Sequence, residues 1–159
     1  MREGSAKAGS LKSIRIPYAP DGYSATAKRL PDLPVAKLLL RRADRRLQAR
    51  GPAVIDTGFD GGVYPSIEAV RLLEGMRPKF AEPLFHPLYG RIESEVFELD
   101  AYIILQDDQR VSLGSVQVYT PTYPEYLSDE SLIGREILNK RRILLDGPAA
   151  TLELLEKAE

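Results

Sequence analysis

The residues of this chain with the clearest chemical potential are Asp56, Thr57 and Gly58, which directly follow the apolar pair Val54-Ile55. An apolar run that ends in Asp-Thr-Gly predicts a buried strand that stops and turns, with the Asp56 carboxylate held at the end of a rigid support. The Thr57 hydroxyl can hydrogen-bond locally, and Gly58 permits close approach of a substrate or another backbone. Because the same residue types are common in ordinary turns, the tripeptide alone allows both a catalytic carboxylate and a simple turn.

A second signature lies downstream, where the apolar pair Leu132-Ile133 runs into Gly134-Arg135 and opens a short amphipathic segment. The two signatures, in this order, resemble those of the retropepsin-like aspartic proteases, the single-lobe relatives of pepsin that include the retroviral proteases. The resemblance covers about residues 35–155. The run from Asp56 to Gly61, followed by Pro65, is most similar to the prokaryotic single-lobe members.

The resemblance implies an all-β fold, namely a single-lobe closed β-barrel of the acid-protease type with one or two short helices. The family chemistry uses two facing aspartates, whereas this chain of 159 residues has a single Asp-Thr-Gly. The resemblance therefore implies a symmetric homodimer in which Asp56 of each copy lies at the two-fold axis.

Two carboxylates about 3 Å apart cannot both ionise, a situation for which aspartic proteases are the standard case, so the pair shares a proton. The ionised Asp56 would act as the general base on a water molecule. The protonated one would hydrogen-bond the scissile carbonyl and then assist the leaving amine. This chemistry requires no metal and no organic cofactor, and we expect neither.

Supporting roles also follow from the resemblance. Thr57 is expected to link the two active-site loops of the dimer, and Gly58 to let the substrate backbone approach. Asp60 and Arg135 occupy positions that in retroviral proteases form an internal ion pair bracing the active-site loop; the alternative is two independent surface charges. Phe59 departs from the small residue usual at its position, which affects the expected shape of the nearest substrate pocket.

Family members cover the active site with a mobile β-hairpin, the flap, that lies between the two signatures. The best candidate tip here is His86–Gly90, which combines Pro and Gly with bulky side chains that could cover a peptide. Tyr89 and Gly90 are therefore the candidate substrate and hinge residues, and an ordinary surface loop is the alternative. His86 is the only histidine, which excludes a His-rich metal site, and we expect it to be a solvated loop residue.

The composition describes a one-domain globular chain, with 43% apolar and 28% charged residues. A net charge of −1 gives no general attraction to nucleic acid or membranes, so neither is an expected partner. We expect a local basic run to form a solvated hairpin rather than a nucleic-acid patch, since no aromatic residues interleave with it. This run consists of Arg41, Arg42, Arg45, Arg46 and Arg50.

The absence of cysteine excludes disulfides and thiol catalysis. Residues 1–13 read as a flexible polar tail that lacks the apolar core of a signal peptide, and residues 14–159 as a single domain. No apolar run approaches the roughly 20 residues of a membrane-spanning helix, so a cytoplasmic location is the expectation.

The remaining pattern predicts the elements that position the two signatures. Residues 14–34 are rich in Pro and could form an edge arm. Strands are expected at 35–40, 52–56, 97–105 and 111–118, with a bulge at Gly114-Ser115, and a closing hairpin at 143–145 and 151–155. Short helices are expected at 65–75, with Ser66 as cap, and at 134–139.

The sequence thus predicts an aspartic endopeptidase that hydrolyses peptide or protein substrates as a homodimer. The alternative is a catalytically silent module of the same fold that binds peptide or dimerises. An intact Asp-Thr-Gly favours the enzyme, because a lobe without chemistry has no reason to hold two facing carboxylates.

Overall fold

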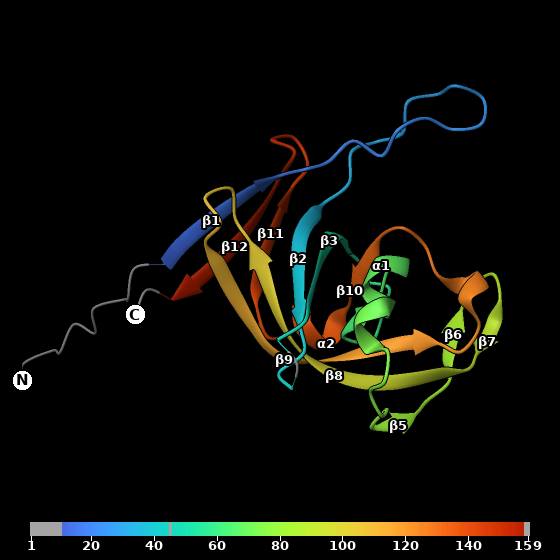
Figure 1. Ribbon diagram of the computed structural model, residues 1–159. Coiled ribbons are helices and arrows are strands. Elements are labelled where there is room, and N and C mark those ends of the chain that lie inside the picture. The colour runs from blue at the N-terminus through green and yellow to red at the C-terminus, as the bar shows by residue number, and fades with distance from the viewer. Residues whose placement is uncertain (1–10, 45, 158–159) are drawn as a thin grey trace, which may run out of the picture.

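The computed structural model describes residues 11–44 and 46–157, and its centre is a closed β-barrel. Six strands follow one another around it, and hydrogen bonding between β2 and β8 closes the ring (Figure 1). In spatial order these strands are β2 (Val35–Arg41), β3 (Gln48–Ile55), β10 (Ser131–Ile133), β4 (Val63–Tyr64), β9 (Arg110–Pro121) and β8 (Ser94–Ile104). The short strand β5 (Phe80–Ala81) extends this sheet beyond β8. The expected all-β fold with a closed barrel and few short helices is confirmed.

The barrel closes around aliphatic side chains that the strand pattern directs inward. In β8 the buried residues include Phe97, Leu99, Ala101 and Ile103, which alternate with more exposed ones as predicted. Strand β9 carries the predicted bulge, since Ala101 lies opposite Gly114 while the next residue of β8 lies opposite Ser112. The extra residue bends the long β8–β9 hairpin so that it can take part in a barrel.

The first predicted helix is shorter than expected. It consists of α1 (Ile67–Val70) and the 3-10 turn η1 (Arg71–Leu73). The Ser66 hydroxyl accepts a hydrogen bond from the Ala69 amide at 3.2 Å, so Ser66 is the N-cap, as predicted.

Arg42 corrects the expectation that the whole basic run is solvated, because its side chain is only 2% exposed. It donates to both carboxylate oxygens of Asp44 at 3.0 and 2.7 Å. It also donates to the carbonyl oxygens of Leu72 and Glu74 at 3.2 and 2.7 Å. Arg42 therefore joins the β2–β3 loop to the end of the helical segment, whose last carbonyls have no intrahelical partner.

Arg42→Ala is expected to lower the midpoint of urea unfolding, because the carbonyl oxygens of Leu72 and Glu74 would lose their donor in a buried place. Arg50→Ala is the control from the same run, since Arg50 is exposed and its Asp108 partner lies 4.0 Å away. Equal midpoints for the two variants would contradict a bridging role for Arg42.

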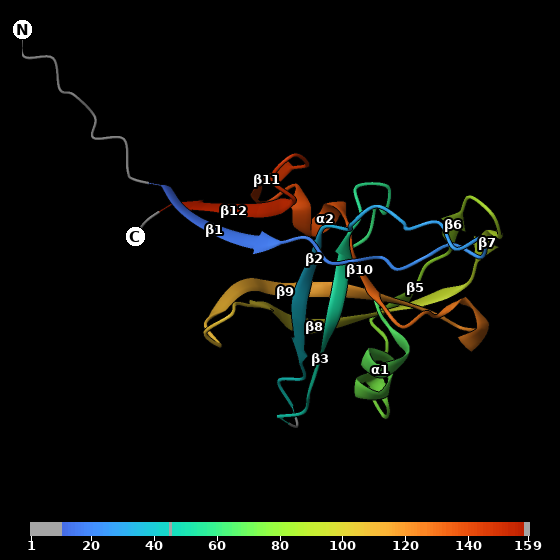
Figure 2. The same ribbon diagram turned by 90° about the horizontal axis from the view of Figure 1, so that it is seen from above.

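A separate three-stranded sheet stands at one end of the barrel, on the side opposite the hairpin of β6 (Leu84–His86) and β7 (Gly90–Ile92) (Figures 1 and 2). Its order is β1 (Leu11–Pro17), β12 (Thr151–Lys157) and β11 (Arg142–Asp146). The predicted closing hairpin is thus present. Strand β1 includes residues 11–13, which the sequence placed in the flexible tail; residues 1–10 lie outside the described residues.

The Pro-rich segment expected to form an edge arm is divided, since residues 14–17 belong to β1 and the rest forms a loop between β1 and β2. Two isolated bridges, Ala19 with Leu33 and Tyr23 with Arg29, hold it together as a long loop that projects from the body (Figure 1). In the described part of the chain, no helix has the length and apolar character needed to cross a membrane.

Candidate active site

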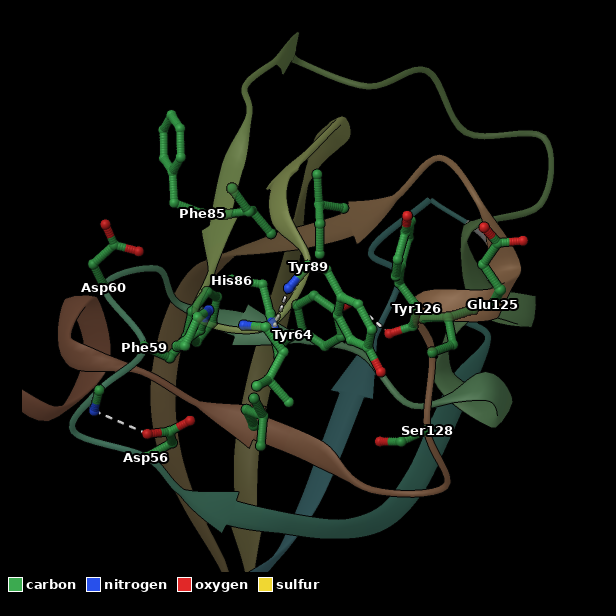
Figure 3. A pocket seen from close by; sticks show the side chains of 17 residues that line it. Asp56, Phe59, Asp60, Tyr64, Phe85, His86, Tyr89, Glu125, Tyr126 and Ser128 are labelled. Carbon is green, nitrogen blue, oxygen red and sulfur yellow. Dashed lines mark hydrogen bonds between the residues drawn. The ribbon is translucent and has the colours of Figure 1, made fainter.

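Asp56 lies where β3 leaves the barrel, and backbone bonds fix its position. Its amide donates to the carbonyl of Ile133 at 3.0 Å, which continues the parallel pairing of β3 with β10. The Gly58 amide donates to Asp56 Oδ1 at 2.9 Å, as Figure 3 shows. The side chain is half-buried, and no other described residue donates to its carboxylate. One oxygen of Asp56 is therefore held by its own loop, while the second is available to a ligand.

The loop that follows Asp56 is held by the start of α2 (Arg135–Leu138) through three backbone bonds. The amides of Gly134, Arg135 and Glu136 donate to the carbonyls of Gly62, Phe59 and Gly61, at 2.8, 2.8 and 3.2 Å respectively. These bonds satisfy amides at the helix N-terminus that have no intrahelical partner. The two sequence signatures are thus brought into direct contact by main-chain atoms.

The ion pair expected between Asp60 and Arg135 is not formed. Both side chains are exposed, and none of the ion pairs among the described residues joins them. Figure 3 shows Asp60 pointing away from Asp56 at one margin of the site. The loop does not need the side-chain pair, because the three backbone bonds from α2 already brace it. Thr57 is exposed, and its expected role between the loops of two copies stays a prediction.

Phe59 fills the space beneath the loop and is the centre of an aromatic cluster. Its ring packs edge-on against Tyr64 and against Tyr119, with both pairs of centroids 6.0 Å apart. The Tyr119 hydroxyl hydrogen-bonds the Glu136 carboxylate. Burial, reinforced by that bond, raises the pKa of Tyr119 well above its ordinary value, so the phenol stays a proton donor. The sequence reading missed Tyr119 and Glu136, whose partnership depends on the fold.

Asp56 opens onto a groove of about 610 Å³ that passes beneath a hairpin. Figure 3 shows Asp56 and Asp60 toward one end of the groove and Glu125 toward the other. Between them the lining is largely apolar, with the six side chains Phe59, Tyr64, Leu84, Ile92, Leu127 and Leu132. Such a lining, with a few carboxylates, suits an extended apolar ligand oriented by polar groups.

The hairpin over the groove consists of β6 (Leu84–His86) and β7 (Gly90–Ile92), with residues 87–89 in its turn. It lies where the sequence placed the candidate flap tip, and Gly90 has a φ of +69°, which glycine adopts without strain. Tyr89 packs against His86, with centroids 4.6 Å apart, and against Tyr126 on the opposite wall, at 5.3 Å. The hairpin therefore reaches across the groove in this structure.

His86 is exposed, as expected of a loop residue, but it also orders the hairpin turn. Its Nδ1 accepts hydrogen bonds from the amides of Leu88 and Tyr89, at 3.1 and 3.4 Å. An imidazole nitrogen can accept only when it carries no proton, so these bonds require neutral Nδ1. The sequence reading missed this function, which arises from side-chain to backbone bonding within the turn.

His86→Ala should loosen the turn, because the amides of Leu88 and Tyr89 lose their acceptor. We expect their hydrogen exchange to speed up by roughly fivefold, the equivalent of one hydrogen bond. His86→Asn should stay near wild type, since an Asn side-chain oxygen accepts from the amide two residues on. Identical exchange in all three proteins would leave His86 without a role in the turn.

The opposite wall of the groove is formed by the 3-10 turn η2 (Pro124–Tyr126), which the sequence reading did not predict. The Tyr64 hydroxyl donates to the carbonyl oxygen of Tyr126 at 2.6 Å and fixes this wall to β4. Burial raises the pKa of Tyr64 to about 12, so the hydroxyl remains a donor at any physiological pH. The dipeptide Tyr123-Pro124 was the available signal, because Pro favours the first position of a helical turn.

No protein-family model matches the sequence. No curated protein matches it either. Among solved structures, the chain is similar to the crystal structure of a retropepsin-like aspartic protease from Rickettsia conorii, with a TM-score of 0.50 and 13% identity over 96% of this chain and 98% of that one. The EIAV protease complexed with the inhibitor HBY-793 matches with a TM-score of 0.35 and 16% identity, over 68% of this chain and 86% of that one. The Rickettsia comparison and the closed barrel together show that this chain has the retropepsin-like fold.

Proposed function

We propose that this chain is an aspartic endopeptidase that works as a homodimer, with one Asp56 from each copy in the active site. The observation that carries the proposal is the placement of Asp56. Its carboxylate is held at the end of β3 by the Gly58 amide and opens onto a groove roofed by a hairpin, in a chain with the retropepsin-like fold.

The chemistry would use the two carboxylates in complementary states, because two such groups in contact share a proton. The ionised Asp56 removes a proton from water as the oxygen attacks the scissile carbonyl carbon. The protonated Asp56 donates to the carbonyl oxygen, and the resulting tetrahedral intermediate collapses when the C–N bond breaks and the amine takes a proton. Over the cycle, the proton that one carboxylate gains is matched by the proton that the other loses. Because the two carboxylates share a proton, their apparent pKa values belong to the pair.

The groove supports a peptide substrate bound in an extended form. Its apolar lining, which includes Phe59, Ile92 and Leu132, suits apolar side chains near the cleaved bond. The β6–β7 hairpin presents backbone groups above the groove, and an extended peptide can pair with such groups as an added strand. Tyr89 and Gly90 would then belong to a flap that moves to admit the peptide, since Tyr89 now spans the groove to Tyr126.

The proposal is tested by cleavage of a diverse peptide library between about pH 4 and pH 7, where a shared-proton pair can operate. The wild-type protein is compared with Asp56→Asn, which keeps the side-chain shape and removes the acid. We expect cleavage by wild type alone. If a folded wild-type dimer cleaves no peptide in the library, the silent peptide-binding or dimerisation module becomes the better description.

A further inference from the structure

Strand β11 presents an unprotected edge. It is the outer strand of the β1-β12-β11 sheet, so among the described residues its backbone has a sheet partner only on the β12 side. Leu144 and Leu145 are 48% and 44% exposed on this strand. An open edge that carries exposed leucines is a ready template for another strand, and soluble proteins usually blunt such edges.

The other outer strand of the same sheet, β1, is protected in the usual ways. It ends in Pro17 and carries the exposed Arg15, and it lies against the barrel, where it lines a groove together with Val35 and Lys37 of β2. Proline and cover by a neighbouring element both oppose edge pairing. The comparison identifies β11 as the edge that is left open to a partner.

The residues of β11 are complementary to a second copy of themselves. The strand reads Arg142-Ile143-Leu144-Leu145-Asp146. Antiparallel pairing centred on Leu144 places Arg142 opposite Asp146 of the partner subunit, and by symmetry the reverse. Apolar residues meet at every position between them. Opposite charges directly across an antiparallel pair attract, and an isologous contact requires this kind of self-complementarity.

We infer that two copies of this chain associate through β11, paired antiparallel about Leu144, to form one continuous six-stranded sheet across the dimer. The inference deepens the proposed function and rests on it, since it identifies the surface that would bring the two Asp56 side chains together. A register shifted by one residue in either direction would separate Arg142 from Asp146, because it would place Ile143 opposite Asp146 or Leu145 opposite Arg142. Either shift is therefore disfavoured.

The position of β11 connects this edge to the candidate active site. Helix α2 lies between β11 and the loop that follows β3, and all three lie on one side of the molecule (Figure 2). Backbone bonds from Lys140 and Arg141 to Ile137 and Leu138 close the end of α2 immediately before β11 begins. Because the start of α2 also holds the Asp56 loop, pairing of the two β11 strands would orient both loops through a short and rigid connection.

The inference is tested by charge exchange on β11, with association measured by sedimentation velocity over a range of concentrations. Arg142→Asp makes both ends of the strand acidic, and Asp146→Arg makes both ends basic. Each variant alone should weaken homodimerisation by about tenfold or more, because attraction becomes repulsion at two symmetric positions. An equimolar mixture of the two variants should form a heterodimer near wild-type strength, since every pair is again of opposite charge.

Replacing Asp146 also removes the hydrogen bond that its Oδ1 accepts from the Ala149 amide in the turn after β11. A second pair of variants therefore tests the contact without changing Asp146. Leu144→Lys places two like charges opposite each other at the centre of the contact and should abolish association. Leu47→Lys is the matched control, because Leu47 is 49% exposed on the β2–β3 loop, and it should leave association unchanged. Thermal unfolding of each variant reports separately on the fold.

The results separate this inference from the proposed function. Loss of the homodimer in both single variants, with recovery in the mixture, supports pairing through β11 whether or not any peptide is cleaved. Association at wild-type strength in Arg142→Asp and Leu144→Lys would overturn the inference, while a cleaving enzyme would still support the function. A wild-type protein that stays monomeric at every concentration would also overturn it.

Discussion

Replacing Asp56 by Asn should reduce kcat/KM for peptide cleavage by at least roughly 10³-fold, since the change removes the general base and the general acid together from the paired site. The substitution preserves the size of the side chain, and the Asn oxygen can still accept the Gly58 amide bond that now reaches Oδ1. The loop should therefore remain folded. Kinetics with the best library peptide, accompanied by circular dichroism and sedimentation of both proteins, measure the effect.

Mixing the two proteins tests whether Asp56 acts as a pair across the dimer. A dimer with one Asp56 and one Asn lacks the complementary carboxylate and should be inactive. With random exchange, an equal amount of Asp56→Asn should lower the activity of a fixed amount of wild type to about half, because only one type of dimer retains both acids. Leu144→Lys in the Asp56→Asn background is the control, because a lysine facing the partner's Leu144 removes the central apolar contact, so mixed dimers should be fewer and the loss of activity smaller.

An unchanged rate in the mixture, despite confirmed exchange of subunits, would show that each copy works alone. Retention of more than about a tenth of wild-type kcat/KM by Asp56→Asn would remove this carboxylate from the catalytic role.

The segments that could be predicted from the sequence are those whose structure depends on local pattern. Strand β3 leading into Asp56, the capped helix at Ser66 and the bulge at Gly114 each depend on residues within a few positions. The β6–β7 hairpin was found in the same way, from Pro and Gly at its turn. These local features were enough to identify the position of the candidate site.

The features that escaped prediction depend on contacts between distant segments. Strands β4 and β10 have two and three residues, too few for a periodic pattern, and they form only because β3 and β9 lie beside them. Arg42 belongs to a run of arginines that is typical of a solvated surface. Its burial depends on the carbonyl oxygens of Leu72 and Glu74, which are about 30 residues away in the sequence and come next to it only in the fold. The expected pair of Asp60 with Arg135 came from the resemblance alone, and backbone bonds perform its bracing role instead.

Gly134→Ala is expected to lower the free energy of unfolding by about 1–3 kcal/mol, the usual cost of inserting a methyl group into a filled space. A Cβ atom on Gly134 would lie 2.3 Å from the Gly61 carbonyl oxygen and 2.5 Å from Phe59 Cδ1. The backbone angles of Gly134, −102° and −175°, are extended and open to alanine, so the cost is steric. The Gly61 oxygen belongs to the loop bound by α2, and it can move aside only if that loop shifts relative to Asp56.

The same variant should therefore lose activity as well as stability, because displacement of the loop moves the support of the carboxylate. Gly51→Ala is the matched control: Gly51 lies in β3, the strand that leads to Asp56, and a Cβ there would meet nothing within 4 Å. Urea unfolding and peptide cleavage of both variants measure the two effects. If Gly134→Ala matched Gly51→Ala in both, the close contact between the two signatures would not be what positions Asp56.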